Sequence, residues 1–206
     1  GEGGAGGGGG GGNGARSAGA ASSGGAGRVV IIPITSGGGD VIGDELGFLE
    51  PTTTGSPQNQ WTNPSNGIIS NEAYATAATV GFRQDYADFG FSIPAGNAIT
   101  GIQVKIEGSG STAAGTIEAA LSWDQGVSTT TVKTTTTLTT ADAVYRLGGA
   151  SDTWGRSWSV SEFSNTNFRL RLVAKPSGNT VRVDALQVKV FYQAGGGGAG
   201  GGGGIE

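Results

Sequence analysis

Residues 89–108 read FGFSIPAGNAITGIQVKIEG, and this stretch decides the fold class. In its second half, Ile102, Val104 and Ile106 share one face of an extended chain, and the residues between them are polar. This alternation is typical of a strand with one buried face and one solvated face. The residues PAGN at 94–97 predict a turn before it. The stretch therefore indicates an antiparallel β-protein.

The same period of two recurs on both sides of that stretch. Apolar residues alternate within 89–93, 117–123 and 168–174, with turn residues between these segments. The pattern extends from residue 61 to residue 194. We therefore expect about eight to ten short strands over this range.

The last candidate strand changes its phase part of the way along. Val181 and Val183 share one face, whereas the apolar series that begins at Leu186 is in the opposite phase. One extra residue in a strand produces such a change. The pattern predicts a β-bulge near Asp184 and Ala185.

Signals for helices are nearly absent. Ser159 and Glu162 have the spacing of a capping box, but Asn165 follows so soon that we expect one helical turn at most. Short strands without helices predict an all-β fold, a single antiparallel β-sandwich of two packed sheets. We expect jelly-roll-like connections between the strands.

The composition divides the chain into segments. We expect a glycine-rich arm at 1–27, an apolar strand at 28–35, a loop-rich linker at 36–60, the β-sandwich at 61–194 and a glycine-rich tail at 195–206. The two glycine-rich arms are expected to be extended and to pack between subunits.

The charge and composition exclude several classes of protein. The net charge is −4 and no cluster of Lys and Arg is present, which disfavours nucleic-acid binding. No apolar run approaches the length of about 20 residues that spans a bilayer. The chain has no Met, so we expect that a signal peptide precedes Gly1 and that the protein is secreted to an extracellular or cell-surface location.

Residues suited to catalysis are scarce. The chain has no His and no Cys, so the usual proton shuttle and thiolate chemistry are missing. Asp40, Asp44 and Glu45 lie in a glycine-containing loop that could hold a structural Ca²⁺, although solvated loop carboxylates are the plainer interpretation. We therefore expect no enzyme, no catalytic residue, and no bound cofactor or metal.

Two features admit an interpretation that involves sugars. Trp154 and Trp158 could stack on a sugar ring, or they could be core residues, because aromatic side chains dominate buried area. Threonine is dense at 52–54 and 129–140, where it could carry O-linked glycans or serve as an ordinary strand residue.

The sequence RVVIIPIT at 28–35 is apolar without alternation, as in a strand buried on both faces. A glycine arm could deliver this strand to a neighbouring subunit, and repeated strand addition builds a filament. Equally, the strand could begin its own sandwich. Its intersubunit side chains would be Val29, Val30, Ile31, Ile32 and Ile34.

The core resembles a broad group of uncharacterised bacterial and phage surface β-sandwich proteins. The resemblance is carried by residues 89–108, by SDTWGRSWSVSEFSNTNFRLRL at 151–172 and by VDALQVKVFY at 183–192. The layout of arms and strand resembles subunits of extracellular pilus-like filaments joined by donor strands.

We therefore expect a structural subunit that assembles head to tail with itself. A phage virion or tail-fibre protein and a carbohydrate-binding module that recognises surface glycans are the alternatives.

Overall fold

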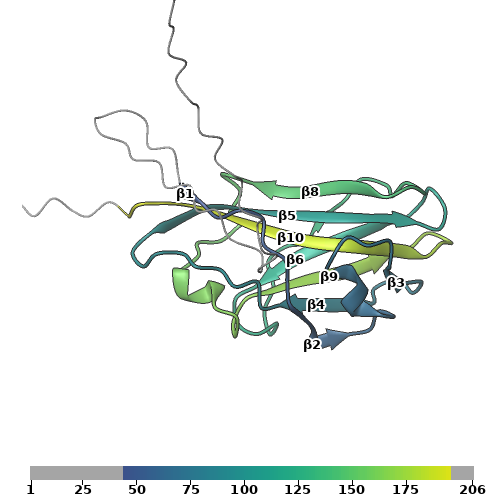
Figure 1. Ribbon diagram of the computed structural model, residues 1–206, viewed down its shortest axis with the longest axis horizontal. Helices are drawn as coiled ribbons and strands as arrows, with labels where there is room; N and C mark the ends of the chain where they lie inside the picture. Colours follow the sequence, from purple (N-terminus) through teal and green to yellow (C-terminus); the bar gives the residue numbers. More distant parts are fainter. Residues whose placement is uncertain (1–43, 196–206) are drawn as a thin grey trace, which may run out of the picture. The chain divides into compact units, whose positions relative to one another are not determined.

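The computed structural model describes residues 44–195, which form two antiparallel sheets of five strands each (Figure 1). The first sheet consists of β1 (Asp44–Glu45), β3 (Ala75–Ala77), β5 (Ala98–Gly110), β8 (Ala143–Gly149) and β10 (Val181–Gln193). The second consists of β2 (Thr53–Asn59), β4 (Arg83–Ala87), β6 (Thr116–Ser122), β7 (Lys133–Thr134) and β9 (Arg169–Lys175). The helical segments of the described range are two 3₁₀ turns, η1 (Pro64–Gly67) and η2 (Val160–Phe163).

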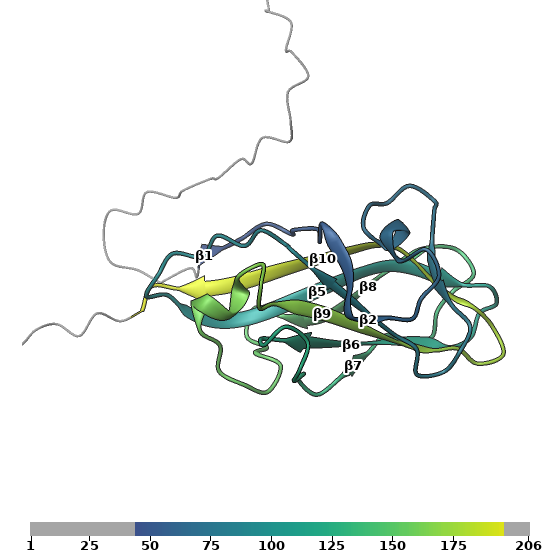
Figure 2. The same ribbon diagram turned by 90° about the horizontal axis from the view of Figure 1, so that it is seen from below.

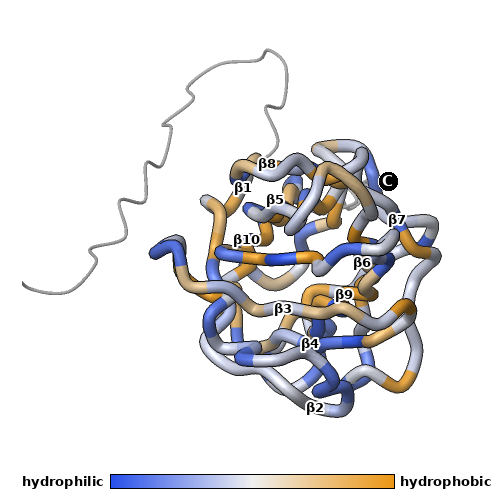
Figure 3. Tube along the Cα trace, turned by 90° about the vertical axis from the view of Figure 1, so that its right-hand side faces the viewer, coloured by the Kyte–Doolittle hydropathy of each residue, from blue (hydrophilic) through white to orange (hydrophobic). Residues whose placement is uncertain are grey.

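The strand order confirms the jelly-roll expectation. The first sheet runs β1-β10-β5-β8, with β3 also paired to β10, and the second runs β2-β4-β9-β6-β7. From β2 onward the chain changes sheet at every connection except β6 to β7. Figure 3 shows the resulting layers, with β8 and β5 on one side and β4 and β2 on the other. Such alternation between two sheets is the jelly-roll arrangement.

The predicted bulge is present in β10. Val183 pairs with Gly108 and Ala185 pairs with Glu107, so Asp184 is the extra residue. Because of this insertion, Val181 and Val183 before Asp184 and the series Leu186, Val188 and Val190 after it are all buried, although their sequence phase differs.

The core lies between the two sheets. Ile102, Val104 and Ile106 of β5 are fully buried, and so are Leu170 and Leu172 of β9. Burying side chains of this size contributes about 1.5–3 kcal/mol each. The alternation read from residues 102–106 therefore identifies the inward face of the first sheet correctly.

One expectation about strands is wrong. Residues 89–93 form no strand; the rings of Phe89 and Phe91 instead stack at 5.4 Å in an aromatic cluster. The expected linker over 36–60 contains strands β1 and β2. These segments are short and polar, so their sequence alone does not predict strands. They form strands because β1 pairs with β10 and β2 pairs with β4.

The threonine-rich segment 129–140 contains only the two-residue strand β7. The hydroxyls of Thr130 and Thr135 accept hydrogen bonds from the backbone N–H groups of Leu121 and Ile117 at 3.0 and 3.1 Å. These threonines complete the edge of β6 with side-chain oxygens. Both are buried, so neither is open to O-glycosylation.

The apolar segment 28–35 and both glycine arms fall outside the described residues. Within residues 44–195, no helix is long and apolar enough to cross a membrane.

Candidate functional site

Trp154, a predicted sugar-stacking residue, is buried in the structure with 3% of its surface exposed. Its indole Nε1 donates a hydrogen bond to the carbonyl oxygen of Ile102 at 2.9 Å. Gly148 makes room for this contact: its φ is +76°, and a Cβ there would lie 2.7 Å from the indole nitrogen. Trp154 therefore anchors the loop after β8 to β5 and offers no ring face to a ligand, which corrects the stacking prediction.

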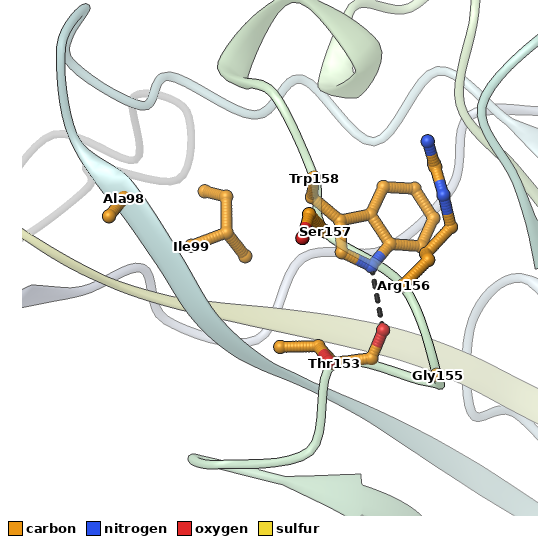
Figure 4. Close-up of a pocket in the computed structure, with 7 residues that line it drawn as sticks. All are labelled: Ala98, Ile99, Thr153, Gly155, Arg156, Ser157 and Trp158. Atoms are coloured by element: carbon orange, nitrogen blue, oxygen red, sulfur yellow. Dashed lines mark hydrogen bonds between the residues drawn. The ribbon is translucent and has the colours of Figure 1, made fainter.

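Trp158 lies at the border of the core. Its ring packs 5.2 Å from that of Phe163 and 6.2 Å from that of Trp123, and 8% of the residue is exposed. Its Nε1 donates to the carbonyl oxygen of Thr153 at 2.8 Å (Figure 4). Trp158 therefore belongs to the aromatic cluster, yet it also contributes to the wall of a surface depression.

This depression, which we call the β5–loop depression, has a volume of about 490 Å³. Figure 4 shows Ala98 and Ile99 of β5 on one side and the loop that follows β8 on the other. Its lining residues are Ala98, Ile99, Thr153, Gly155, Arg156, Ser157 and Trp158. Apolar groups and hydroxyls thus face the same space.

Arg156 holds the loop in place. Its guanidinium carbon lies 3.8 Å from the ring centroid of Trp123 and 4.4 Å from that of Trp158. Its Nη2 donates to Oε1 of Glu162 at 2.7 Å. Its Nη1 is shielded from solvent and has no hydrogen-bond partner within the described residues. Within the described residues, this nitrogen is therefore an unsatisfied donor.

Glu162 fixes the position of Arg156 and also caps η2. Its Oε2 accepts a hydrogen bond from the backbone N–H of Ser159 at 2.7 Å, which completes the predicted capping box. Burial would raise the pKa of Glu162, but the hydrogen bonds from Arg156 and Ser159 outweigh burial and hold that pKa below its ordinary value. The carboxylate is therefore ionised at neutral pH.

The lining groups are suited to binding. Thr153 and Ser157 offer hydroxyls and backbone groups, Ile99 and Trp158 offer apolar surface, and none of the seven lining residues carries a carboxylate. General acid–base chemistry on a ligand needs a titrating group within hydrogen-bond reach. The lining supplies no such group.

Sequence reasoning missed Arg156 as a site residue. The segment WGRSWSVSEF at 154–163 places a cation between two Trp residues and six residues before Glu162. This spacing could have indicated Arg156 as a site residue, because Arg prefers to stack on aromatic faces.

The other predicted site residues are not brought to this depression. Asp44 and Glu45 form β1 and pair with Tyr192 and Phe191, whereas Asp40 lies outside the described residues. The predicted intersubunit residues from Val29 to Ile34 also lie outside them.

Similarity to known proteins is found among solved structures. No protein-family model matches the chain, and no curated protein matches it significantly. Among solved structures, it is similar to the CBM36-1 domain of a multidomain xylanase from the hindgut metagenome of Trinervitermes trinervoides, with 12% identity, coverage of 79% of this chain and 100% of that one, and a TM-score of 0.40.

Two further structures show the same likeness. TmCBM61, solved in complex with β-1,4-galactotriose, is 12% identical, with coverage of 66% and 86% and a TM-score of 0.34. The C-terminal CBM6 of LamC from Zobellia galactanivorans is 9% identical, with coverage of 72% and 99% and a TM-score of 0.35. At such identities no ligand is transferred to this chain.

These matches correct the expected function. The sequence predicts a filament subunit that assembles with itself, whereas the matched structures are carbohydrate-binding modules and not filament proteins. The prediction of a filament subunit is therefore wrong.

Proposed function

We propose that this β-sandwich is a carbohydrate-binding module and that the β5–loop depression is its ligand site. The observation that carries the proposal is the joint presence of apolar surface and unused polar groups in one depression. Ile99 and the Trp158 indole offer surface to the C–H face of a sugar ring. Ser157 is exposed and offers a hydroxyl to the sugar's own hydroxyls.

The charge of the site favours a neutral glycan. Arg156 is the cation of the lining, and its Nη2 is already paired with Glu162 at 2.7 Å. The chain as a whole carries a net charge of −4, which repels a polyanionic sulfated or uronic polysaccharide. Neutral sugars need hydrogen bonds and apolar contact instead, and the lining offers both.

The size of the depression sets the scale of the ligand. A volume of about 490 Å³ is within the range of about 300–1,000 Å³ that is typical of small-ligand sites. A depression of this size holds about one or two sugar units. Because so few sugar units make contact, the expected affinity for a short oligosaccharide is modest. Binding to a polysaccharide gains from many equivalent positions along the polymer.

We propose binding without catalysis and an extracellular location, where polysaccharides are found. The lack of His and Cys in the sequence and the lack of a carboxylate in the lining support the non-catalytic interpretation. Hydrolytic activity against the same glycans is the direct alternative, and release of reducing sugar by the purified protein would reveal it.

The first test is a binding screen. The protein is run in native gels containing xylan, β-1,4-galactan or a soluble β-glucan, with a sulfated galactan as the anionic counterpart. We expect at least one neutral polysaccharide to retard the protein and the sulfated one to have no effect. Retardation by the sulfated polymer alone would show that the ligand is anionic and not neutral. No retardation by any polymer would reject the proposal.

A further inference from the structure

Three carboxylates from distant parts of the chain meet at the opposite end of the sandwich from the β5–loop depression. Glu72 lies between η1 and β3, Asp142 directly precedes β8, and Asp184 is the bulge residue of β10. One carboxylate oxygen from each lies within 4.8 Å of the other two. Figures 1 and 2 place η1 and η2 at opposite ends of the two sheets. The cluster is therefore separate from the proposed sugar site.

Asp184 is a fully buried carboxylate with very little compensation. Within the described residues, its two oxygens share a single donor, the backbone N–H of Asn71, at 3.1 and 3.2 Å. The ion pairs of residues 44–195 do not involve it. A buried carboxylate normally requires a cation or several hydrogen bonds, because removing its charge from water costs several kcal/mol.

Asp142 provides a second, independent sign of a missing partner. Its Oδ1 is shielded from solvent and accepts no hydrogen bond within the described residues. A solvent-shielded carboxylate oxygen without a donor is rare in folded proteins, and its usual partner is a bound ion or water. This atom and the buried Asp184 belong to the same cluster.

The Tyr74 hydroxyl cannot satisfy the cluster. It lies 2.8 Å from Oε2 of Glu72 and 2.8 Å from Oδ2 of Asp142, but it carries only one hydrogen. At any moment, one of the two oxygen–oxygen contacts lacks a hydrogen. A positive charge among these oxygens would remove this repulsion.

We propose that Glu72, Asp142 and Asp184 bind a hard divalent cation of the Ca²⁺ class. All three donors are oxygens, which Ca²⁺ prefers, and no nitrogen or sulfur ligand is available for zinc. Two oxygens on opposite sides of an ion with bonds of about 2.4 Å lie about 4.8 Å apart, so three oxygens that all lie within 4.8 Å of one another can reach a single Ca²⁺ ion. Its irregular coordination also tolerates backbone oxygens and water as the remaining ligands.

The ion has a structural role in this proposal. It joins the segment after η1 to the start of β8 and to the β10 bulge, three parts of the chain separated by more than 40 residues each. The Asp184 insertion, which the sequence already marks, is the feature that turns a carboxylate toward the other two. The bulge thus creates the site and does not merely correct the phase of the strand.

The test uses the full chain after treatment with EDTA and buffer exchange. CaCl₂ is titrated in by calorimetry at pH 7, and melting curves are recorded in Ca²⁺ and in EDTA. We expect one ion per chain and a melting temperature several degrees higher in Ca²⁺. Glu72→Gln, at an exposed position that leaves the core intact, and Asp142→Asn should each weaken binding at least tenfold. Glu50→Gln, an exposed carboxylate outside the cluster, should change nothing.

Three results would overturn the proposal. The first is the absence of heat and of a melting shift with Ca²⁺, Mg²⁺ or Mn²⁺. The second is binding that Glu72→Gln leaves unchanged, because the ion would then lie elsewhere. The third is a metal-independent protein that becomes more stable as the pH falls from 7 to 5, because a shared proton would then neutralise the cluster. Each of these outcomes is independent of glycan binding.

Discussion

Asp85 and Arg171 face each other across the β4–β9 ladder and form a buried, bidentate ion pair. Nε of Arg171 donates to Oδ1 of Asp85 at 2.7 Å, and Nη2 donates to Oδ2 at 2.8 Å. Nη2 also donates to the carbonyl oxygen of Gly126 at 2.8 Å, and Oδ2 accepts the backbone N–H of Gln58. The pair therefore joins β2 and the turn after β6 to the outer face of the second sheet.

Removing one partner of this pair should be costly. Arg171→Met leaves the Asp85 carboxylate buried without a cation, and we expect a loss of about 3–5 kcal/mol in the free energy of unfolding. Urea denaturation measures it. The control is Glu118→Gln, which breaks the half-exposed pair with Lys175 and should cost less than about 1 kcal/mol. Equal effects of the two substitutions would show that the buried pair has no special role.

Gly126 should resist substitution for a reason that Gly178 does not share. Both have positive φ, +87° and +71°. A Cβ on Gly126 would lie 2.3 Å from Cδ of Pro57, whereas a Cβ on Gly178 would meet nothing within 4 Å. We expect Gly178→Ala to cost about 1–2 kcal/mol from backbone strain alone, and Gly126→Ala to cost clearly more. Thermal melts of the two variants compare them directly, and a smaller loss for Gly126→Ala would contradict the packing described here.

Thr135 and Thr136 are neighbours with different roles. Thr135→Val removes the oxygen that accepts the backbone N–H of Ile117, so a buried donor is left unsatisfied. We expect a loss of about 1–3 kcal/mol. Thr136 is exposed, and Thr136→Val should change the stability by less than about 0.5 kcal/mol. Chemical denaturation of both variants tests the difference, and hydrogen exchange at Ile117 should become faster only in Thr135→Val.

The pH dependence of stability should show the contribution of Glu162. Burial raises the pKa of Glu162, but the hydrogen bonds from Arg156 and Ser159 lower it further, so the folded-state pKa lies below the unfolded value near 4.5. A depressed pKa stabilises the fold above the unfolded pKa, and this stabilisation is lost as the pH falls through the folded pKa. Glu162→Gln should therefore be less stable than the wild type at pH 7 and equal to it at low pH. A constant difference at all pH values would contradict this assignment.

The sequence predicts much of the sandwich because strand alternation is local. The inward residues of β5 and the β10 bulge at Asp184 follow from the phase of neighbouring side chains. Strands β1 and β2 are not visible in this way, because they are short and polar and depend on partners far along the chain. The strand predicted at 89–93 does not form. Phe89 and Phe91 instead pack on Phe168 and Phe163, and this packing accounts for their alternation.

The candidate sites are less visible in the sequence for the same reason. The depression forms only when the loop after β8 folds against the start of β5, and the cluster joins Glu72, Asp142 and Asp184 from three segments. Trp154 and Trp158 attract notice in the sequence, but whether a ring face is exposed depends on tertiary packing. Trp154 is buried against Ile102 and cannot stack on a sugar ring. Of the two tryptophans predicted to stack on a sugar, only Trp158 lines the depression.

The most direct test of the proposed function is the dissociation constant for a neutral oligosaccharide taken from the best-retained polysaccharide. It is measured by calorimetry for the wild type and for two variants. Ser157→Trp fills the depression from an exposed position, and Thr136→Trp adds the same side chain at an exposed position outside the depression. We predict binding by the wild type and by Thr136→Trp, and at least a tenfold loss in Ser157→Trp while its melting curve is unchanged. Undiminished binding by Ser157→Trp would contradict the assignment of the site.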